Sequence, residues 1–181
     1  GNLERDLATV LRLAEATGSE AGAMAAFIRN SAHRRDWVLR LLHAEVLGRK
    51  ADAVIGVLGL AYKENTGSTK NSAALALIGH LRPWRVRLFD PVVPASAAAH
   101  PQAVEASSAE EAAQGADALA IMTPWPEFRR LDPAALARAM RGRTIIDPYR
   151  VLDAAAAGAA GLDYFTLGAP PRRQMQGGTH A

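Results

Sequence analysis

Five short apolar segments alternate with helix-like segments from residue 52 onward, and this alternation restricts the fold more than any other feature. The apolar segments read AVIGVLGLA (53–61), RVRLFD (85–90), ADALAIMT (116–123), GRTIID (142–147) and DYFTL (163–167). Helices are expected between and after them, at 72–82, 107–114, 132–140 and 150–159. Strands separated by helices are typical of a parallel sheet with helices on both faces and right-handed crossovers. The sequence therefore predicts a doubly wound α/β domain.

The first 50 residues follow a different pattern, that of long helices. Residues 3–17 place apolar side chains at helical spacing, and Gly18 is expected to end that helix. A second helix is expected over 20–47, with apolar ends and the polar run RNSAHRRD between them. Such a helix does not look like a core helix and can pair with a partner helix or line a cleft. We therefore predict a helical linker at 1–50, a domain at 51–168 and a flexible, aperiodic tail at 169–181.

Composition excludes several classes of function. The formal net charge of +3 is small, and its cations are spread along the chain, which favours a solvated basic surface over nucleic-acid binding. The absence of cysteine excludes disulfides, thiolate metal sites and a cysteine nucleophile within this chain, and the five histidines form no metal-ligating pairs with acids.

The ends and the apolar runs of the chain give two expectations. No apolar run approaches the roughly 18 residues of a membrane span and no signal peptide opens the chain, so we expect a cytoplasmic protein without a membrane partner. The chain opens on an already helical pattern, so we expect it to be part of a longer protein.

The loops after the strands carry the candidate binding residues, because a doubly wound sheet binds ligands outside the carboxyl ends of its strands. Lys63, Lys70 and Arg150 would place positive charge at this edge, which suits a phosphate or a carboxylate. Gly56 and Gly59 give the pattern GxxGxA rather than the GxGxxG of a dinucleotide loop. Phosphate binding and simple strand–helix packing therefore both stay open for these glycines.

Two further residues at strand ends have competing interpretations. Asp90 ends the second strand, where a dinucleotide fold often places its ribose-binding acid, but it lies farther beyond Gly59 than the expected roughly 20 residues. A turn-forming Asp-Pro pair is the favoured interpretation. Trp125, between two prolines, is interpreted as a packing anchor rather than a stacking platform. The residues alone thus indicate an α/β domain with a basic, nucleotide-like edge and a helical arm.

Four motifs, in their order along the chain, resemble the UDP-glucose/GDP-mannose dehydrogenase family. They read GVLGLAYKENTGSTKNSAAL, VRLFDPVV, ADALAIMTPWPEF and TIIDPYRVLD. Upstream, RDLATVLRLAEATG and FIRNSAHRRDWV resemble the family's linker segment and central helix. The resemblance covers residues 2–168 and is to the carboxyl-terminal part of such an enzyme.

This resemblance implies a nucleotide-sugar dehydrogenase, which oxidises the sugar C6 alcohol towards a uronic acid for polysaccharide precursors. It implies a Rossmann-like nucleotide-sugar-binding domain at 51–168, a UDP-sugar or GDP-sugar substrate and a homodimer formed through helix 20–47. NAD would be bound mainly by an amino-terminal domain absent from this chain, so this chain alone would be inactive.

The resemblance also implies roles for individual residues. Tyr62 and Lys63 match the family's aromatic–lysine pair at the substrate. Lys70 falls where the family usually has an arginine that reaches the NAD pyrophosphate. Tyr149 falls where the family usually has an arginine near the nucleotide sugar, and the neighbouring Arg150 is the candidate replacement.

The position of the family's catalytic cysteine is occupied by Asn2, when the chain is aligned on Asp6. Asn2 cannot form a thiohemiacetal and is favoured as a helix N-cap. Asp6 matches an aspartate that orients a water in the family, a role left open here without the thiol. Glu4 and Ser68 also depart from the usual residues. The alternative is a catalytically silent homologue that binds a nucleotide sugar or serves as a scaffold.

Overall fold

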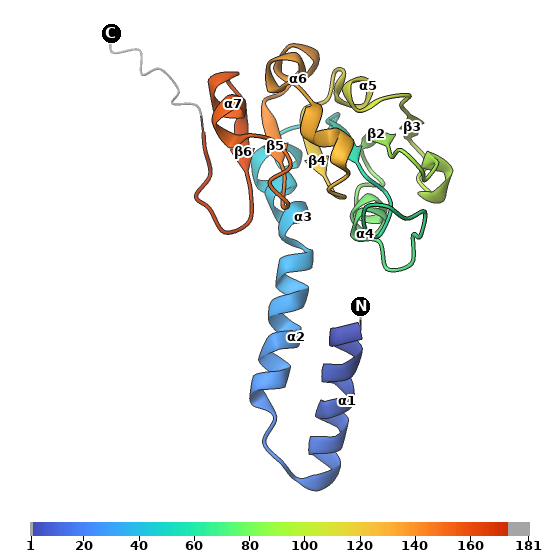
Figure 1. Cartoon of the computed structure of the whole chain (residues 1–181), viewed down its shortest axis with the longest axis vertical. Helices are drawn as coiled ribbons and strands as arrows, with labels where there is room; N and C mark the ends of the chain where they lie inside the picture. The colour runs from blue at the N-terminus through green and yellow to red at the C-terminus, as the bar shows by residue number, and fades with distance from the viewer. Residues whose placement is uncertain (1, 174–181) are drawn as a thin grey trace. The chain divides into compact units, whose positions relative to one another are not determined.

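The structure is a computed structural model and describes residues 2–173. The chain forms two compact units, which divide between Trp37 and Val38. The first unit consists of two helices that pack against each other, α1 (Asn2–Thr17) and α2 (Gly22–Arg35) (Figure 1).

The single helix predicted over 20–47 is three helical segments in the structure. After α2, Asp36 separates it from α3 (Trp37–Leu42), which continues into the π-helical turn η1 (His43–Leu47). No side chain of α2 is buried, whereas α3 and η1 contribute apolar side chains to the core of the second unit. The boundary between the two units therefore lies between Trp37 and Val38, earlier in the chain than the boundary at residue 50 that the sequence predicts. The buried residues of α3 and η1 are Val38, Leu42, Val46 and Leu47.

The second unit is built on a six-stranded sheet with the order β3-β2-β1-β4-β5-β6. The strands are β1 (Val54–Leu58), β2 (Arg85–Phe89), β3 (Ala103–Glu105), β4 (Ala118–Ile121), β5 (Thr144–Ile146) and β6 (Asp163–Phe165). Every neighbouring pair is parallel. From β1 the chain adds β2 and β3 on one side, then crosses over and adds β4, β5 and β6 on the other side of β1, so the strand order switches between β1 and β4. The predicted doubly wound, Rossmann-like parallel sheet is confirmed.

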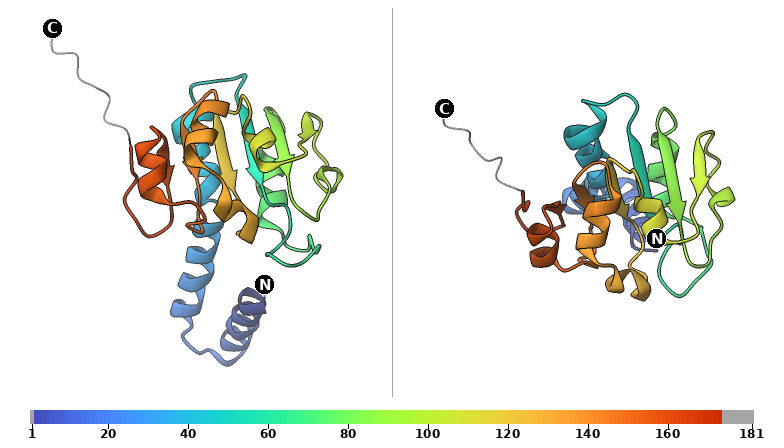
Figure 2. Two further views of the ribbon diagram at one scale, coloured as in Figure 1. Left: turned by 45° about the horizontal axis from the view of Figure 1, so that its top comes forward. Right: turned by 90° about the horizontal axis from the view of Figure 1, so that it is seen from above.

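Helices cover both faces of this sheet (Figure 2). α5 (Ala109–Ala113), α6 (Pro133–Ala139) and α7 (Ala154–Ala159) form a layer on one face, and α4 (Ala73–His80) lies on the other. Short 3₁₀ turns, η2 (Ala95–Ala97) and η3 (Pro126–Arg130), complete the connections. The four predicted helices are confirmed, and each begins at a side chain that accepts a backbone N–H from its first turn. These caps are Ser72, Ser108, Asp132 and Asp153.

The strand β3 was not predicted. It is three residues long, lies at the edge of the sheet and pairs only with β2. Its side chains are half-buried or exposed, so the sequence shows neither an apolar run nor a clear alternation there. Only the pairing with β2 makes this segment a strand.

The first residues of the tail predicted at 169–181 make contacts with the second unit. Tyr164 and Arg172 exchange two backbone hydrogen bonds of 2.8 and 3.0 Å, which adds an antiparallel bridge beside β6. The guanidinium of Arg173 donates to the Glu45 carboxylate at 2.7 and 3.1 Å. It also lies 5.3 Å from the centroid of the Phe165 ring. The tail beyond Arg173 lies outside the described residues.

Candidate functional site

The carboxyl ends of the parallel strands meet at one edge of the sheet, and the candidate residues lie in loops that leave from this edge. Tyr62 and Lys63 follow β1, Asp90 follows β2, and Trp125 follows β4. The loop after β5 lies on the far side of β4 and carries Tyr149 and Arg150. We call this the nucleotide-like edge, defined by these loops.

The glycine turn after β1 is a site of close backbone packing. Gly59 has a φ of 88°, and a Cβ added to it would lie 2.4 Å from Thr123 Cβ and 2.6 Å from Thr123 N. Within β1, a Cβ on Gly56 would lie 2.6 Å from Leu119 Cδ1 and 2.8 Å from the carbonyl oxygen of Ala112 in α5. Both positions therefore need glycine for packing, Gly59 against Thr123 and Gly56 against Leu119 and Ala112, whatever the loop binds.

The two residues after the turn have all four of their backbone polar groups hydrogen-bonded. The N–H groups of Leu60 and Ala61 donate to the Asp90 carboxylate at 2.6 and 3.0 Å. The Leu60 carbonyl accepts from the Ser72 hydroxyl, and the Ala61 carbonyl accepts from the Thr123 hydroxyl, each at 2.7 Å. We call these two residues the Leu60–Ala61 anchor. Its N–H groups are already used, so it offers no backbone donor to a phosphate.

The predicted substrate-binding residues leave directly from this anchor. Tyr62 is 48% exposed, and Lys63 is exposed beside it. The Tyr62 N–H donates to the Ser68 carbonyl at 2.8 Å, which closes the loop behind them. Lys70 is exposed in the same loop, two residues before the cap of α4. Tyr62, Lys63 and Lys70 thus lie on one loop, whose first two residues are the hydrogen-bonded Leu60–Ala61 anchor.

Asp90 joins three loops at this edge. Its Oδ1 accepts from the N–H groups of Val92 and Val93, both at 2.9 Å. Its Oδ2 accepts the two anchor N–H groups and the indole Nε1–H of Trp125 at 3.0 Å. Burial opposes ionisation of this carboxyl, but the backbone hydrogen bonds outweigh it and hold the pKa of Asp90 below its usual value. The Asp-Pro turn is therefore confirmed, as is Trp125 as a packing anchor, since it is 6% exposed.

The loop after β5 repeats this arrangement around a second Asp-Pro pair. Asp147 is fully buried, and its carboxylate accepts from Tyr149 N at 3.1 Å and from Leu152 N at 2.9 Å. The hydroxyl of Tyr164 in β6 donates to the same carboxylate at 2.7 Å. Burial, and then this carboxylate, raise the pKa of Tyr164. Each aspartate thus shapes its own loop and holds an aromatic donor from another segment.

The remaining predicted substrate residues lie on this second loop. Tyr149 is 46% exposed. Arg150 is exposed and has a φ of 56°, a left-handed conformation that is uncommon for a residue with a side chain. Its guanidinium donates to the Leu167 carbonyl at 3.0 Å, beyond the end of β6. Tyr149 and Arg150 therefore belong to the β5 side of the nucleotide-like edge, and the Tyr62 loop to its β1 side.

The two residues aligned with the family's catalytic positions lie in the first unit. Asn2 lies within α1 in the described part of the chain, and its side chain lies outside that part. Asp6 has a largely exposed carboxylate, which pairs with the Arg5 guanidinium at 3.4 Å. In this unit Asp6 is a solvated acid beside a cation.

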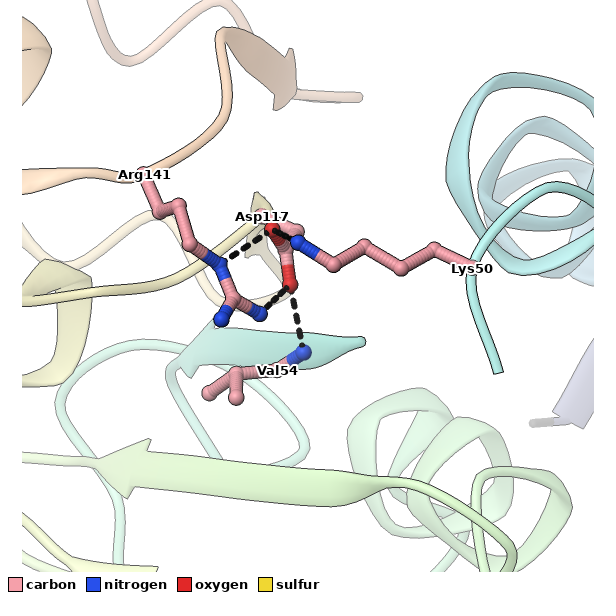
Figure 3. Close-up of polar contacts among 4 residues, drawn as sticks. All are labelled: Lys50, Val54, Asp117 and Arg141. Atoms are coloured by element: carbon pink, nitrogen blue, oxygen red, sulfur yellow. Dashed lines mark hydrogen bonds and ion pairs between the residues drawn. The ribbon is translucent and has the colours of Figure 1, made fainter. Parts of the chain in front are cut away.

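A charge cluster around one buried carboxylate lies at the opposite, amino-terminal edge of the sheet. The Asp117 side chain is 6% exposed. It accepts from Lys50 Nζ, Val54 N and Arg141 Nε, each at 2.8 Å, and from Arg141 Nη2 (Figure 3). Burial raises the pKa of Asp117, but hydrogen bonds from Arg141, Lys50 and Val54 outweigh it and lower the pKa to about 2. Sequence reasoning did not find this cluster, because its members are far apart in the chain and form no motif.

The described part of the chain contains neither a metal-ligating cluster nor a membrane-spanning helix. In residues 2–173 there is no group of three or more histidine or acidic side chains that could hold a metal ion. Nor does any described helix combine the length and the apolarity needed to cross a bilayer.

Residues 56–154 match a family model described as "UDP-glucose/GDP-mannose dehydrogenase family, UDP binding domain". This match covers more than half of the chain. The chain belongs to this family. The family match contains the Tyr62 loop, both Asp-Pro pairs and Arg150.

Relatives in the family align with the chain over part of their own length. A UDP-glucose 6-dehydrogenase of Pseudomonas aeruginosa is 29% identical over 175 residues, which are 92% of this chain and 39% of the relative. A UDP-N-acetyl-D-mannosamine dehydrogenase of Pyrococcus horikoshii is 36% identical over 106 residues, which are 58% of this chain and 23% of the relative. The chain thus spans about two fifths or less of these relatives.

Solved structures show the same fold. A UDP-glucose dehydrogenase of Pyrobaculum islandicum superposes with a TM-score of 0.71 over 90% of this chain and 36% of that chain, at 24% identity. A UDP-D-ManNAc dehydrogenase of Pyrococcus horikoshii has a TM-score of 0.56 over 82% of this chain and 31% of its own, at 28% identity. The fold is therefore that of the family.

Proposed function

We propose that the second unit binds the nucleotide of a UDP-sugar or GDP-sugar at the nucleotide-like edge. The observation that carries this proposal is the exposed Tyr62–Lys63 pair, which leaves from a fully bonded anchor within the stretch matched by the family's UDP-binding model. A lysine held in this way neutralises a phosphate or donates to a sugar oxygen. Tyr149 and Arg150 are proposed as further contacts on the β5 side.

Lys63→Ala is expected to weaken UDP binding about tenfold, because a hydrogen bond from a charged donor contributes about 1.5 kcal/mol or more. Isothermal titration of the 181-residue chain with UDP, UDP-glucose and GDP-mannose measures this loss. Arg143→Ala is the matched control, since it removes one exposed positive charge at the amino end of β5. It should bind UDP as the parent does. Equal UDP affinity in the parent and Lys63→Ala would contradict the proposal, as would no binding by the parent.

For the longer protein we propose NAD-dependent oxidation of the sugar C6 alcohol towards a uronic acid, as a step in making polysaccharide precursors. The dehydrogenase relatives support this. The second unit does not fit NAD in the usual Rossmann mode, because the anchor N–H groups bind Asp90 and the Gly59 turn packs on Thr123. NAD, which would accept the hydride, is therefore proposed to be bound mainly outside this chain, with Lys70 contacting its pyrophosphate. We expect no turnover by this chain alone, and we place the activity in the cytoplasm.

A second candidate function keeps nucleotide-sugar binding without oxidation. Asn2 takes the position of the family's catalytic cysteine, and Ser68 and Tyr149 replace its usual acid and arginine. These departures favour a silent nucleotide-sugar-binding or scaffold homologue. Release of NADH by the longer protein distinguishes the two: sustained release supports oxidation, and its absence with retained UDP binding supports the silent homologue.

We further propose that the protein forms a homodimer through the helical region 20–47. Phe27 supports this, because it is 60% exposed on a helix that has no buried side chain. Phe27→Arg is expected to shift the sedimenting species from twice the chain mass to the chain mass, because a second copy can no longer cover that position. The UDP affinity should stay unchanged. A parent chain that sediments as a monomer at micromolar concentration would contradict the dimer.

A further inference from the structure

Asp90 occupies the place at the end of β2 where a dinucleotide-binding domain has the acid that binds a ribose hydroxyl. Its carboxylate already accepts five hydrogen bonds, two at Oδ1 and three at Oδ2. A carboxylate offers about four lone-pair positions, so these donors saturate it. A ribose hydroxyl at this position would have to displace one of the bonds that hold the loops.

The bonds from Asp90 converge on the two residues that precede the proposed phosphate-binding pair. Oδ2 takes both N–H groups of the Leu60–Ala61 anchor, while Ser72 and Thr123 take its carbonyls. Each residue of the anchor is thereby held at both its N–H and its carbonyl. The backbone positions of Tyr62 and Lys63 in the folded protein depend on this anchor, because these residues follow it directly in the chain.

Trp125 extends the same network to the loop after β4. Its indole N–H donates to Oδ2 at 3.0 Å, the same oxygen that holds the anchor. The ring is buried, so the indole has a fixed position from which it orients the carboxylate. Asp90 therefore links the loops after β1, β2 and β4 through one side chain.

We propose that Asp90, oriented by Trp125, is a positioning residue that sets Lys63 against the nucleotide phosphates and does not bind the ribose. The proposal rests on the nucleotide-binding function proposed above and names what fixes that site. Recognition of the nucleotide then falls to the side chains beyond the anchor, and the acid at the end of β2 gives no selection between ribose and deoxyribose.

Asp90→Asn tests this with two ligands, UDP and 2′-deoxy-UDP, titrated into the 181-residue chain. Asparagine keeps the size but replaces one acceptor oxygen by a donor, so the anchor loses bonds. We expect both ligands to bind about tenfold more weakly, by the same factor. Loss of UDP affinity with unchanged 2′-deoxy-UDP affinity would show that Asp90 binds the ribose, and would overturn the proposal.

The UDP affinity of the double variant Asp90→Asn, Lys63→Ala distinguishes a positioning role of Asp90 from a general effect on folding. If Asp90 acts through Lys63, Lys63→Ala should weaken UDP binding much less in the Asp90→Asn background than in the parent. Independent, additive losses would overturn the proposal. Trp125→Phe keeps an aromatic ring at this position and removes the indole N–H, so it should show a smaller loss of the same kind. Thermal melts identify a temperature at which all variants are folded.

Hydrogen exchange gives a readout that needs no ligand. In Asp90→Asn, the amides of Leu60 and Ala61 should exchange faster, while those of β5 stay protected. Unchanged protection of the two anchor amides would overturn the proposal even if the parent binds UDP. If the parent binds no UDP, the proposed function fails, and faster exchange confined to the anchor still supports the role of Asp90 in fixing this loop.

Discussion

Asp117→Asn is expected to lower the free energy of unfolding by about 2–3 kcal/mol, because it removes the charge that Lys50 and Arg141 share. The remaining cations are partly exposed and regain water, which keeps the loss below that of a fully buried pair. Asparagine can still accept the Val54 N–H. Urea unfolding of parent and variant at pH 7 measures the difference.

The matched control for this change is Glu127→Gln, which alters an exposed acid outside the cluster. It should change the free energy of unfolding by less than about 0.5 kcal/mol. If the two variants have the same stability, the Asp117 cluster contributes nothing beyond a surface charge.

The same cluster makes stability depend on acid pH. The folded-state pKa of Asp117 is about 2, against 3.8 for an unperturbed aspartate, so the unfolded state takes up the proton first as pH falls. Its contribution is complete above pH 5 and is lost progressively from about pH 4 to pH 2. The difference in unfolding free energy between the parent and Asp117→Asn should therefore shrink over this interval. A difference that is constant from pH 6 to pH 2 would contradict this assignment.

Gly59→Ala is expected to lower the free energy of unfolding by about 3 kcal/mol or more. Two penalties add: a side chain at a left-handed φ costs about 1–2 kcal/mol, and overpacking costs about 1–3 kcal/mol. The overpacking arises because the new Cβ would meet the backbone and side chain of Thr123 within 2.7 Å. Thermal and urea unfolding of the variant measure the sum.

Gly161→Ala separates these two penalties. Gly161 has a φ of 82°, close to the 88° of Gly59, but an added Cβ there meets nothing within 4 Å. Its loss of stability should stay at the conformational penalty of about 1–2 kcal/mol. Equal losses at both glycines would mean that Thr123 moves away without cost, and that the turn is not a close packing site.

The order of elements and the positions of the strand ends could be predicted from the sequence, because local signals specify them. Apolar runs marked five of the six strands, and Ser72, Ser108, Asp132 and Asp153 precede the helices that they cap. The four motifs also identified the family that the matched stretch confirms. Tyr62 and Lys63 were placed on the loop after β1 for the same reason, since they directly follow an apolar run.

Only the tertiary structure decided how the loops are held. Asp90 meets the anchor and Trp125, Asp117 meets Lys50 and Arg141, and Arg173 meets Glu45, all across long stretches of sequence. A local pattern cannot encode such contacts, because they depend on which strands become neighbours in the sheet. The same holds for β3, which is a strand only through its pairing with β2. The sequence by itself thus determined the family, the sheet and the edge at which the site is proposed, while the folded sheet decided that the acid at the end of β2 holds loops together.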